Sequence, residues 1–116
     1  MLRPSSRAAA RLVDSAPVFA ALGDRTRLQL VVRLCLEGPL SITSLGTGAA
    51  VTRQAITKHL QALAAAGLVC DTRCGRERIW QIEPQRLSQA RLCLEQISQQ
   101  WDQALGRLRA LVEDEE

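Results

Sequence analysis

The sequence predicts a mainly α-helical protein with one small β-hairpin, and three patterns support this prediction. Apolar residues recur every three or four positions along most of the chain, which is the spacing of helices with one buried face. Two short strand-like runs flank the tetrapeptide CGRE at residues 74–77. The last third of the chain carries an apolar heptad pattern, which is typical of one long helix. The expected element order is therefore α-α-α-α-β-β-α.

Size and composition indicate a single soluble domain. The chain has 116 residues, 23% of them charged, and no apolar run approaches the ~20 residues of a membrane span. The first residues contain no apolar signal core, so we expect a cytoplasmic protein. Residues 1–86 hold 12 Lys/Arg and 6 Asp/Glu (net +6), whereas residues 87–116 hold 3 and 6 (net −3). The basic part is suited to attract phosphates.

Two helices are expected before residue 38. The first covers residues 15–22, with residues 1–14 as an N-terminal arm or an extension of this helix. Asp24 is suited to cap the second helix, because its carboxylate can accept a hydrogen bond from a free amide of the first turn. The pair Gly38-Pro39 ends this helix. The apolar positions expected to face inward are Leu28, Val31, Leu34 and Cys35.

A short helix and a longer helix should follow, joined by a turn. Ser41 is a suitable N-cap for the short helix at residues 42–45, which the segment GTGAA ends. Thr52 is suited to cap the longer helix, residues 52–66. Gly67 supplies the left-handed residue that ends it.

A two-stranded hairpin is expected next, from residues 69–73 and 78–82. Strand alternation places Trp80 and Ile82 on its inward face. A short helix, a turn, a longer helix and a hairpin form a winged helix-turn-helix, which we assign to residues 15–84.

The final helix is expected over residues 85–112, followed by an acidic tail at 113–116. Its apolar positions alternate in steps of three and four, namely Leu87, Ala90, Leu94, Ile97, Trp101, Ala104, Leu108 and Leu111. A domain of this size has little core left to cover such a stripe, so we expect a homodimer seam shared with the first helix. The residues expected in the interface are Phe19, Leu87, Leu94, Ile97, Trp101 and Leu108. The alternative is that the helix packs on its own domain.

The helix at residues 52–66 gathers polar side chains on one arc of roughly 140°. Arg and Lys reach guanine edges or phosphates, and Gln pairs with adenine. No acidic residue occurs between Val51 and Val69, whereas a solvated helix face usually mixes Glu with its basic residues. We therefore expect a recognition helix for double-stranded DNA rather than a solvated face. The residues expected to contact DNA are Thr52, Arg53, Gln54, Thr57, Lys58 and Gln61.

The hairpin tip is a second candidate for DNA contact. Arg73, Arg76 and Arg78 surround Gly75, and Glu77 partly offsets their charge. Arginines on such a wing can contact phosphates or enter the minor groove. The alternative is a tip whose charges only keep it soluble.

Three segments of the chain strongly resemble the ArsR/SmtB family of bacterial repressors. They are FAALGDRTRLQLVVRLCLEGPLSI, VTRQAITKHLQALAAAGLV and the wing RCGRERIWQIEP. The resemblance implies a dimeric winged-helix repressor that binds inverted-repeat operators and leaves them when an effector arrives. It also implies that helices 42–45 and 52–66 form the helix-turn-helix. Arg53, Gln54, Thr57 and Lys58 then fall at positions that contact bases or phosphates.

The metal-site motifs of this family are missing. One family site uses Cys-x-Cys on the helix before the recognition helix, where this chain has LSITSL at residues 40–45. Another uses His and carboxylates on the last helix, where this chain has no His. The single histidine, His59, is expected on the inward side of its helix as a packing residue. We therefore expect no metal or other cofactor.

The four cysteines leave the effector open. Cys35 reads as a small core residue, but in some members of the family a thiol at this place pairs with one like Cys93 as a redox or persulfide sensor. Cys70 and Cys74 are about 13 Å apart on an extended strand, too far for a disulfide. Cys74 at the tip could also bind arsenic or a similar metal. Sensing through Cys35/Cys93 or Cys70/Cys74 is therefore an alternative to a repressor without an effector.

Catalysis is not expected, because the sequence contains no Gly-rich phosphate loop, no clustered carboxylates and no exposed Cys-His pair. The remaining alternative is a winged-helix module that binds another protein and has lost DNA binding.

Overall fold

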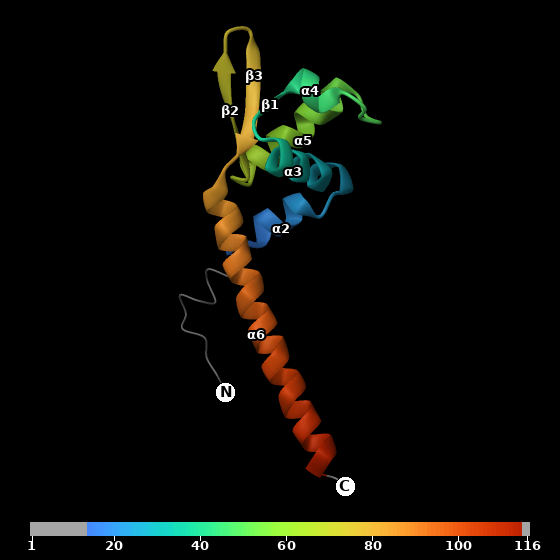
Figure 1. The fold of residues 1–116 in the computed structure, drawn as a ribbon, viewed down its shortest axis with the longest axis vertical. Coiled ribbons are helices and arrows are strands. Elements are labelled where there is room, and N and C mark those ends of the chain that lie inside the picture. The colour runs from blue at the N-terminus through green and yellow to red at the C-terminus, as the bar shows by residue number, and fades with distance from the viewer. Residues whose placement is uncertain (1–13, 115–116) are drawn as a thin grey trace.

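The computed structural model describes residues 14–114 (Figure 1). Residues 1–13 of the arm expected over residues 1–14 therefore lie outside the described residues. The elements are α2 (Ala16–Leu22), α3 (Arg25–Glu37), β1 (Leu40–Ser41), α4 (Ile42–Gly46), α5 (Arg53–Ala65), β2 (Val69–Cys74), β3 (Glu77–Ile82) and α6 (Pro84–Asp114). Helices α2 to α5 and the base of the sheet form a head. The turn end of the β2–β3 hairpin and helix α6 extend from this head in opposite directions (Figure 1). The chain measures 68 × 30 × 20 Å, and α6 accounts for its elongation.

The three expected N-caps are confirmed. Asp24, Ser41 and Thr52 each accept a hydrogen bond from the backbone amide three residues later, at 3.0, 3.2 and 3.1 Å. The bond to Asp24 comes from Arg27 and is the main cause that lowers the pKa of the Asp24 carboxyl. Because each cap satisfies an amide that the helix itself leaves free, the local sequence determines where these helices begin.

The β-structure has one strand more than the sequence predicted. The hairpin β2–β3 is confirmed, and Gly75 turns it with φ 65°. The two-residue strand β1 also pairs with β3, with Leu40 opposite Trp80 and Ser41 opposite Ile79. The two-stranded hairpin is present as predicted, and β1 is an additional strand that the sequence did not predict. A two-residue strand is too short to show the alternation by which strands are recognised in sequence.

The core lies between α2, α3, α5, the sheet and the first turns of α6. Its largest fully buried side chains are Trp80, Leu45, Ile56, Leu60, Leu63, Leu68 and Val18. On α3, Val31 and Leu34 are buried as expected, but Leu28 is 47% exposed and Cys35 is exposed. Leu30 is buried in addition. The core assignments of Leu28 and Cys35 were wrong, because the neighbouring elements cover the opposite edge of the α3 stripe.

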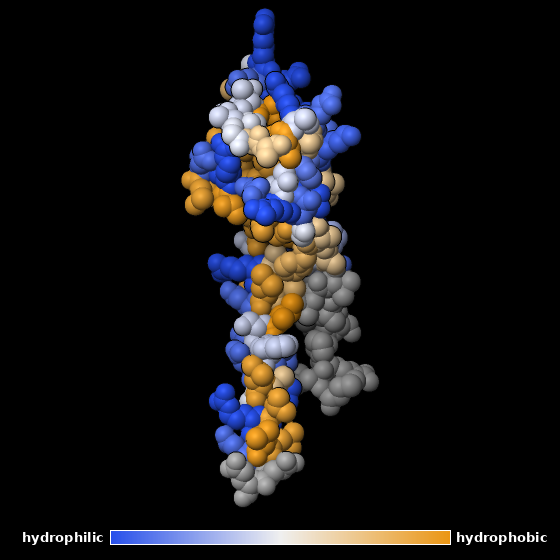
Figure 2. All heavy atoms as spheres, turned by 90° about the vertical axis from the view of Figure 1, so that its right-hand side faces the viewer, coloured by the Kyte–Doolittle hydropathy of each residue, from blue (hydrophilic) through white to orange (hydrophobic). Residues whose placement is uncertain are grey.

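Helix α6 begins one residue before the expected start and runs to Asp114, so the tail assigned to residues 113–116 is helical at least in its first two residues. Its first turns pack on the head, where Ala90 and Cys93 are buried and Leu87 is half-buried. Beyond these turns the heptad side chains are exposed, and Figure 2 shows two orange apolar stretches along the helix, separated by a paler zone. Between residues 14 and 114, no helix combines the length and apolar content needed to cross a bilayer.

Gly67→Ala is expected to lower the free energy of unfolding by about 1–2 kcal/mol. Gly67 ends α5 with φ 79°, and an added Cβ would lie 2.9 Å from Cγ of Arg86. The matched control is Gly106→Ala inside α6, where an added Cβ meets nothing within 4 Å. This control is expected to raise the free energy of unfolding, by up to ~1 kcal/mol. Urea denaturation at one protein concentration tests both variants, and a Gly67→Ala protein as stable as wild type would contradict the expectation.

Candidate nucleic-acid interface

Helix α5 presents its polar side chains to solvent while its apolar side packs into the head. Ile56, Leu60 and Leu63 are almost completely buried, so the rotation of the helix about its own axis is determined by packing. Thr57 is half-buried, and its hydroxyl donates to the carbonyl of Arg53 at 3.0 Å. The exposed polar residues of this face are Thr52, Arg53, Gln54, Lys58 and Gln61.

A recess of about 260 Å³ lies between the start of α4, the start of α5 and the wing formed by β2 and β3. The structure brings together here residues that the sequence assigned separately to a helix and to a hairpin. The lining residues are Ser41, Ile42, Thr43, Arg53, Thr57, Arg73, Arg76, Glu77 and Arg78. Gln54, Lys58 and Gln61 lie outside the recess on the exposed face of α5.

The start of α4 was missed as part of this interface. Ser41 and Thr43 line the recess with hydroxyl-bearing side chains, and Thr43 is exposed. The sequence predicts an N-cap at Ser41 and no metal-binding thiols in this segment, and neither feature indicates a DNA contact. Its hydroxyl-rich composition is compatible with phosphate contacts, but only the folded chain shows that it lies beside the wing.

The three wing arginines differ in their surroundings. Arg78 donates to Asp71 across the hairpin at 2.8 Å, and its guanidinium lies 5.6 Å from the centre of the Trp80 ring. Within residues 14–114, Arg73 and Arg76 have no carboxylate at ion-pair distance. The recess therefore collects four arginines against Glu77 alone, and Arg73 and Arg76 are the wing side chains free to meet an anion.

His59 is not the core residue that the sequence predicted. Its Nδ1 lies 3.5 Å from Nη1 of Arg27 and 3.9 Å from Oδ2 of Asp24, and its side chain is 24% exposed. Arg27 also donates from Nε to the carbonyl of Ala21 at 2.7 Å. His59 therefore joins α5 to the beginning of α3 through polar contacts.

The cysteines are spread over the fold. Cys35 is exposed on α3, Cys93 is buried on α6, Cys70 is half-buried and Cys74 is exposed on the wing. Among residues 14–114, no three His, Cys, Asp or Glu side chains are grouped so that they could hold a metal ion. Sensing through Cys35/Cys93 or Cys70/Cys74 stays a prediction.

Known transcriptional regulators resemble this chain along most of its length. An HTH-type transcriptional regulator of Mycobacterium tuberculosis, Rv2034, is 37% identical over 97 residues, which are 84% of this chain and 87% of the relative. No family model matches the sequence.

Solved structures of transcriptional regulators and of a DNA-binding domain also resemble this chain. An ArsR-like transcriptional regulator from Rhodococcus sp. RHA1 superposes with a TM-score of 0.72 at 38% identity, over 85% of this chain and 92% of its own. The homodimeric winged helix-turn-helix DNA-binding domain of Mb0332 from Mycobacterium bovis superposes with a TM-score of 0.62 at 31% identity, over 86% and 91%. These proteins are named as regulators or as DNA-binding domains, and not as enzymes.

Proposed function

Because this chain belongs to the ArsR family of winged helix-turn-helix transcriptional regulators, we propose that it is a cytoplasmic repressor that binds operator DNA as a homodimer. The observation that carries this proposal is the arginine-rich recess between α4, α5 and the wing. It joins the helix suited to enter a major groove with the hairpin suited to contact the adjoining backbone.

In this proposal α5 lies in the major groove and reads bases. Arg53 and Gln54 lie in its first turn, where a recognition helix reaches the base edges. An arginine fork matches the O6 and N7 acceptors of guanine, and a glutamine amide matches N6 and N7 of adenine. Lys58 and Gln61 extend the contact along the same face, and Thr57 lies nearer the recess.

The recess is proposed to hold a phosphate of the DNA backbone. No carboxylate of residues 14–114 lies at ion-pair distance from Arg73 or Arg76, and the exposed side chain of Thr43 lines the same recess. Arg78 contributes charge while it stays paired with Asp71. Contacts of this kind fix the position of the protein on the duplex and are largely independent of sequence.

The exposed stripe of α6 is proposed to form the dimer seam. Leu94, Ile97, Trp101 and Leu108 are each at least half exposed in the single chain, although they follow the heptad pattern. A second copy with the same stripe would cover them, as helices with a 3,4 repeat do in coiled coils. Two α5 helices related by a two-fold axis would then read an inverted repeat. The Mycobacterium bovis domain, which is homodimeric, supports this assembly.

Arg76→Ala is expected to weaken binding to all duplexes alike and to flatten its dependence on salt. Wild-type protein should bind DNA from upstream of its own gene, with affinity that falls steeply as salt rises. Loss of one phosphate contact per subunit should reduce the slope of log K against log salt by about 2 for a dimer. Fluorescence anisotropy across a salt series measures this slope.

The matched control for Arg76→Ala is Arg109→Ala on α6, which removes the same charge from an exposed position outside the recess. Its slope should equal that of wild type. If wild-type protein bound no duplex in a salt-dependent way, the repressor proposal would fail, and a module that binds another protein would take its place.

A further inference from the structure

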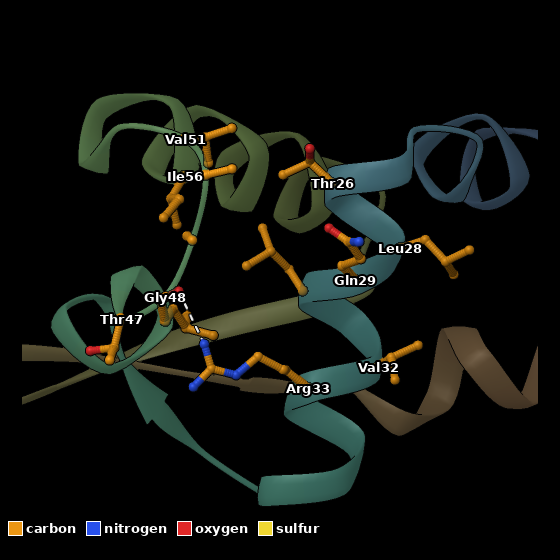
Figure 3. Close-up of a pocket in the computed structure, with 13 residues that line it drawn as sticks. Thr26, Leu28, Gln29, Val32, Arg33, Thr47, Gly48, Val51 and Ile56 are labelled. Carbon is orange, nitrogen blue, oxygen red and sulfur yellow. Dashed lines mark hydrogen bonds between the residues drawn. The ribbon is translucent and has the colours of Figure 1, made fainter.

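Arg33 of α3 makes three hydrogen bonds, two to the end of α4 and one to Glu37 of its own helix. Its Nη1 and Nη2 donate to the carbonyls of Leu45 and Ser44, each at 3.1 Å, and its Nε donates to Oε2 of Glu37 at 2.7 Å. Figure 3 shows the guanidinium reaching from α3 toward the last turn of α4. An arginine with two nitrogens on two consecutive carbonyls, and a third on a carboxylate, is held in one orientation.

Helix α4 needs such a partner. It has five residues, and a helix this short is not stable without tertiary contacts. Its last carbonyls have no partners further along the helix, so they must be satisfied from outside. Thr47 provides two of the bonds, from its hydroxyl to Thr43 at 3.1 Å and from its amide to Ser44 at 3.2 Å. Arg33 adds the bond to Leu45 and brings a positive charge to the negative end of the helix dipole.

Side-chain packing does not close this side of the head. A hollow of about 770 Å³ lies between α3 and the segment from Thr47 to Val51, which joins α4 to α5. In Figure 3, Thr26 and Gln29 lie on the flank of α3 nearer Val51, whereas Leu28 and Val32 point away from the joining segment. Arg33 spans from α3 to α4 at the edge of this hollow. At this edge of the head, the hydrogen bonds from Arg33 to Ser44 and Leu45 therefore hold α3 and α4 together.

We infer that Arg33 is a positioning residue for DNA recognition, and this inference rests on the proposed function. Arg33 does not line the recess, so it has no part in the proposed phosphate contact. It holds the end of α4, while Ser41 and Thr43 at the start of α4 form one wall of the recess. Loss of the clamp would let α4 and the joining segment shift relative to α5 and the wing.

The test compares Arg33→Met with wild type on two duplexes, the operator selected by wild-type protein from random DNA and an unrelated duplex. Operator affinity is expected to fall about 10–100-fold, because both subunits lose the clamp. Affinity for the unrelated duplex should fall much less, by no more than about threefold, because the wall with Thr43 shifts while the recess arginines that carry the charge stay in place. The salt slope should stay at the wild-type value, because no charged phosphate contact is removed. The inference would be overturned if Arg33→Met bound the operator as tightly as wild type. It would also be overturned if the variant lost affinity by the same factor on both duplexes.

The matched control is Arg91→Met on α6. Arg91 and Glu95 form an i,i+4 ion pair at 3.5 Å, and Arg33 and Glu37 form one at 2.7 Å. Unlike Arg33, Arg91 donates to no carbonyl of residues 14–114. This variant should bind both duplexes like wild type. Hydrogen exchange of the free proteins adds a measurement that needs no DNA: amides of residues 44–50 should exchange faster in Arg33→Met and not in Arg91→Met. Unchanged exchange in Arg33→Met would contradict the clamp even if the repressor proposal itself failed.

Arg33→Lys separates the clamp from general stability. A lysine ammonium can donate to the two adjacent carbonyls but cannot keep the planar three-way arrangement. Operator affinity is therefore expected to lie between wild type and Arg33→Met, with a smaller loss on the unrelated duplex than on the operator. If Arg33→Met did not fold, Arg33→Lys would decide alone: about threefold weaker operator binding supports the clamp, and wild-type binding refutes it.

Discussion

Trp101→Glu is expected to convert the protein from a dimer to a monomer in sedimentation at micromolar concentration. Trp101 is 66% exposed in the single chain and lies at the middle of the α6 stripe. In the proposed seam the substitution removes a large apolar contact and buries a carboxylate in each subunit. The cost is on the order of 5 kcal/mol per dimer, enough to raise the dimer dissociation constant by more than a thousandfold.

The same variant should lose operator affinity without any change at the recess. A monomer reaches one half-site at a time, so it forfeits the intramolecular second binding step, which contributes about 10²–10⁴ in affinity. Anisotropy with the full inverted repeat and with a single half-site distinguishes loss of the second binding step from damage to the recess. Affinity for the half-site should equal that of a wild-type subunit.

The control for Trp101→Glu is Gln99→Glu. It makes the same change of charge on the same helix, but at ~100° per residue Gln99 faces away from the stripe. This variant should stay dimeric. A Trp101→Glu protein that sediments as a dimer would remove α6 from the interface, and the partner surface would have to be sought elsewhere on the head.

Arg53→Ala is expected to relax the sequence preference of the protein. Arg53 is exposed in the first turn of α5 and also lines the recess, so it is placed where the helix would meet both bases and backbone. Loss of a bidentate contact to a base reduces discrimination by about 1–3 kcal/mol per half-site. With two half-sites, the ratio between the affinity for the operator and the affinity for an unrelated duplex should fall by about 30-fold or more.

Competitive selection from a library mutated one base pair at a time measures this effect. The variant should tolerate substitutions at one symmetric pair of positions and keep its preferences elsewhere. Arg76→Ala provides the contrast, because it should weaken all sequences together. If Arg53→Ala lost affinity uniformly and kept its preferences at every position, Arg53 would be a phosphate contact and Gln54 would be the stronger candidate for base reading.

The helix boundaries and the exposed polar face of α5 could be predicted from sequence because their causes are local. A cap acts on an amide three residues away, and the glycine that ends α5 has the expected positive φ. The alternation of polar and apolar residues on α5 follows the helical repeat, and the burial of Ile56 and Leu60 confirms it. These features depend on neighbours within about one turn of the chain.

The features that the sequence missed or predicted wrongly concern contacts between distant residues. Strand β1 exists only because residues 40–41 meet β3, and nothing in two residues signals a strand. Cys35 is exposed although it follows the apolar stripe of α3, because no element within residues 14–114 covers that edge. His59 lies among polar groups because Asp24 and Arg27 approach it from another helix.

By itself, the sequence determined the order and type of the helices and the hairpin, the polar face of α5 and the apolar stripe of α6. Only the tertiary structure decided which of these surfaces meet. It placed the start of α4 beside the wing arginines, paired Arg78 with Asp71, and set Arg33 across the end of α4. The physical reason is one of range: caps, turns and periodicity act between close neighbours in the chain, whereas the recess and the clamp form between residues that only packing brings together.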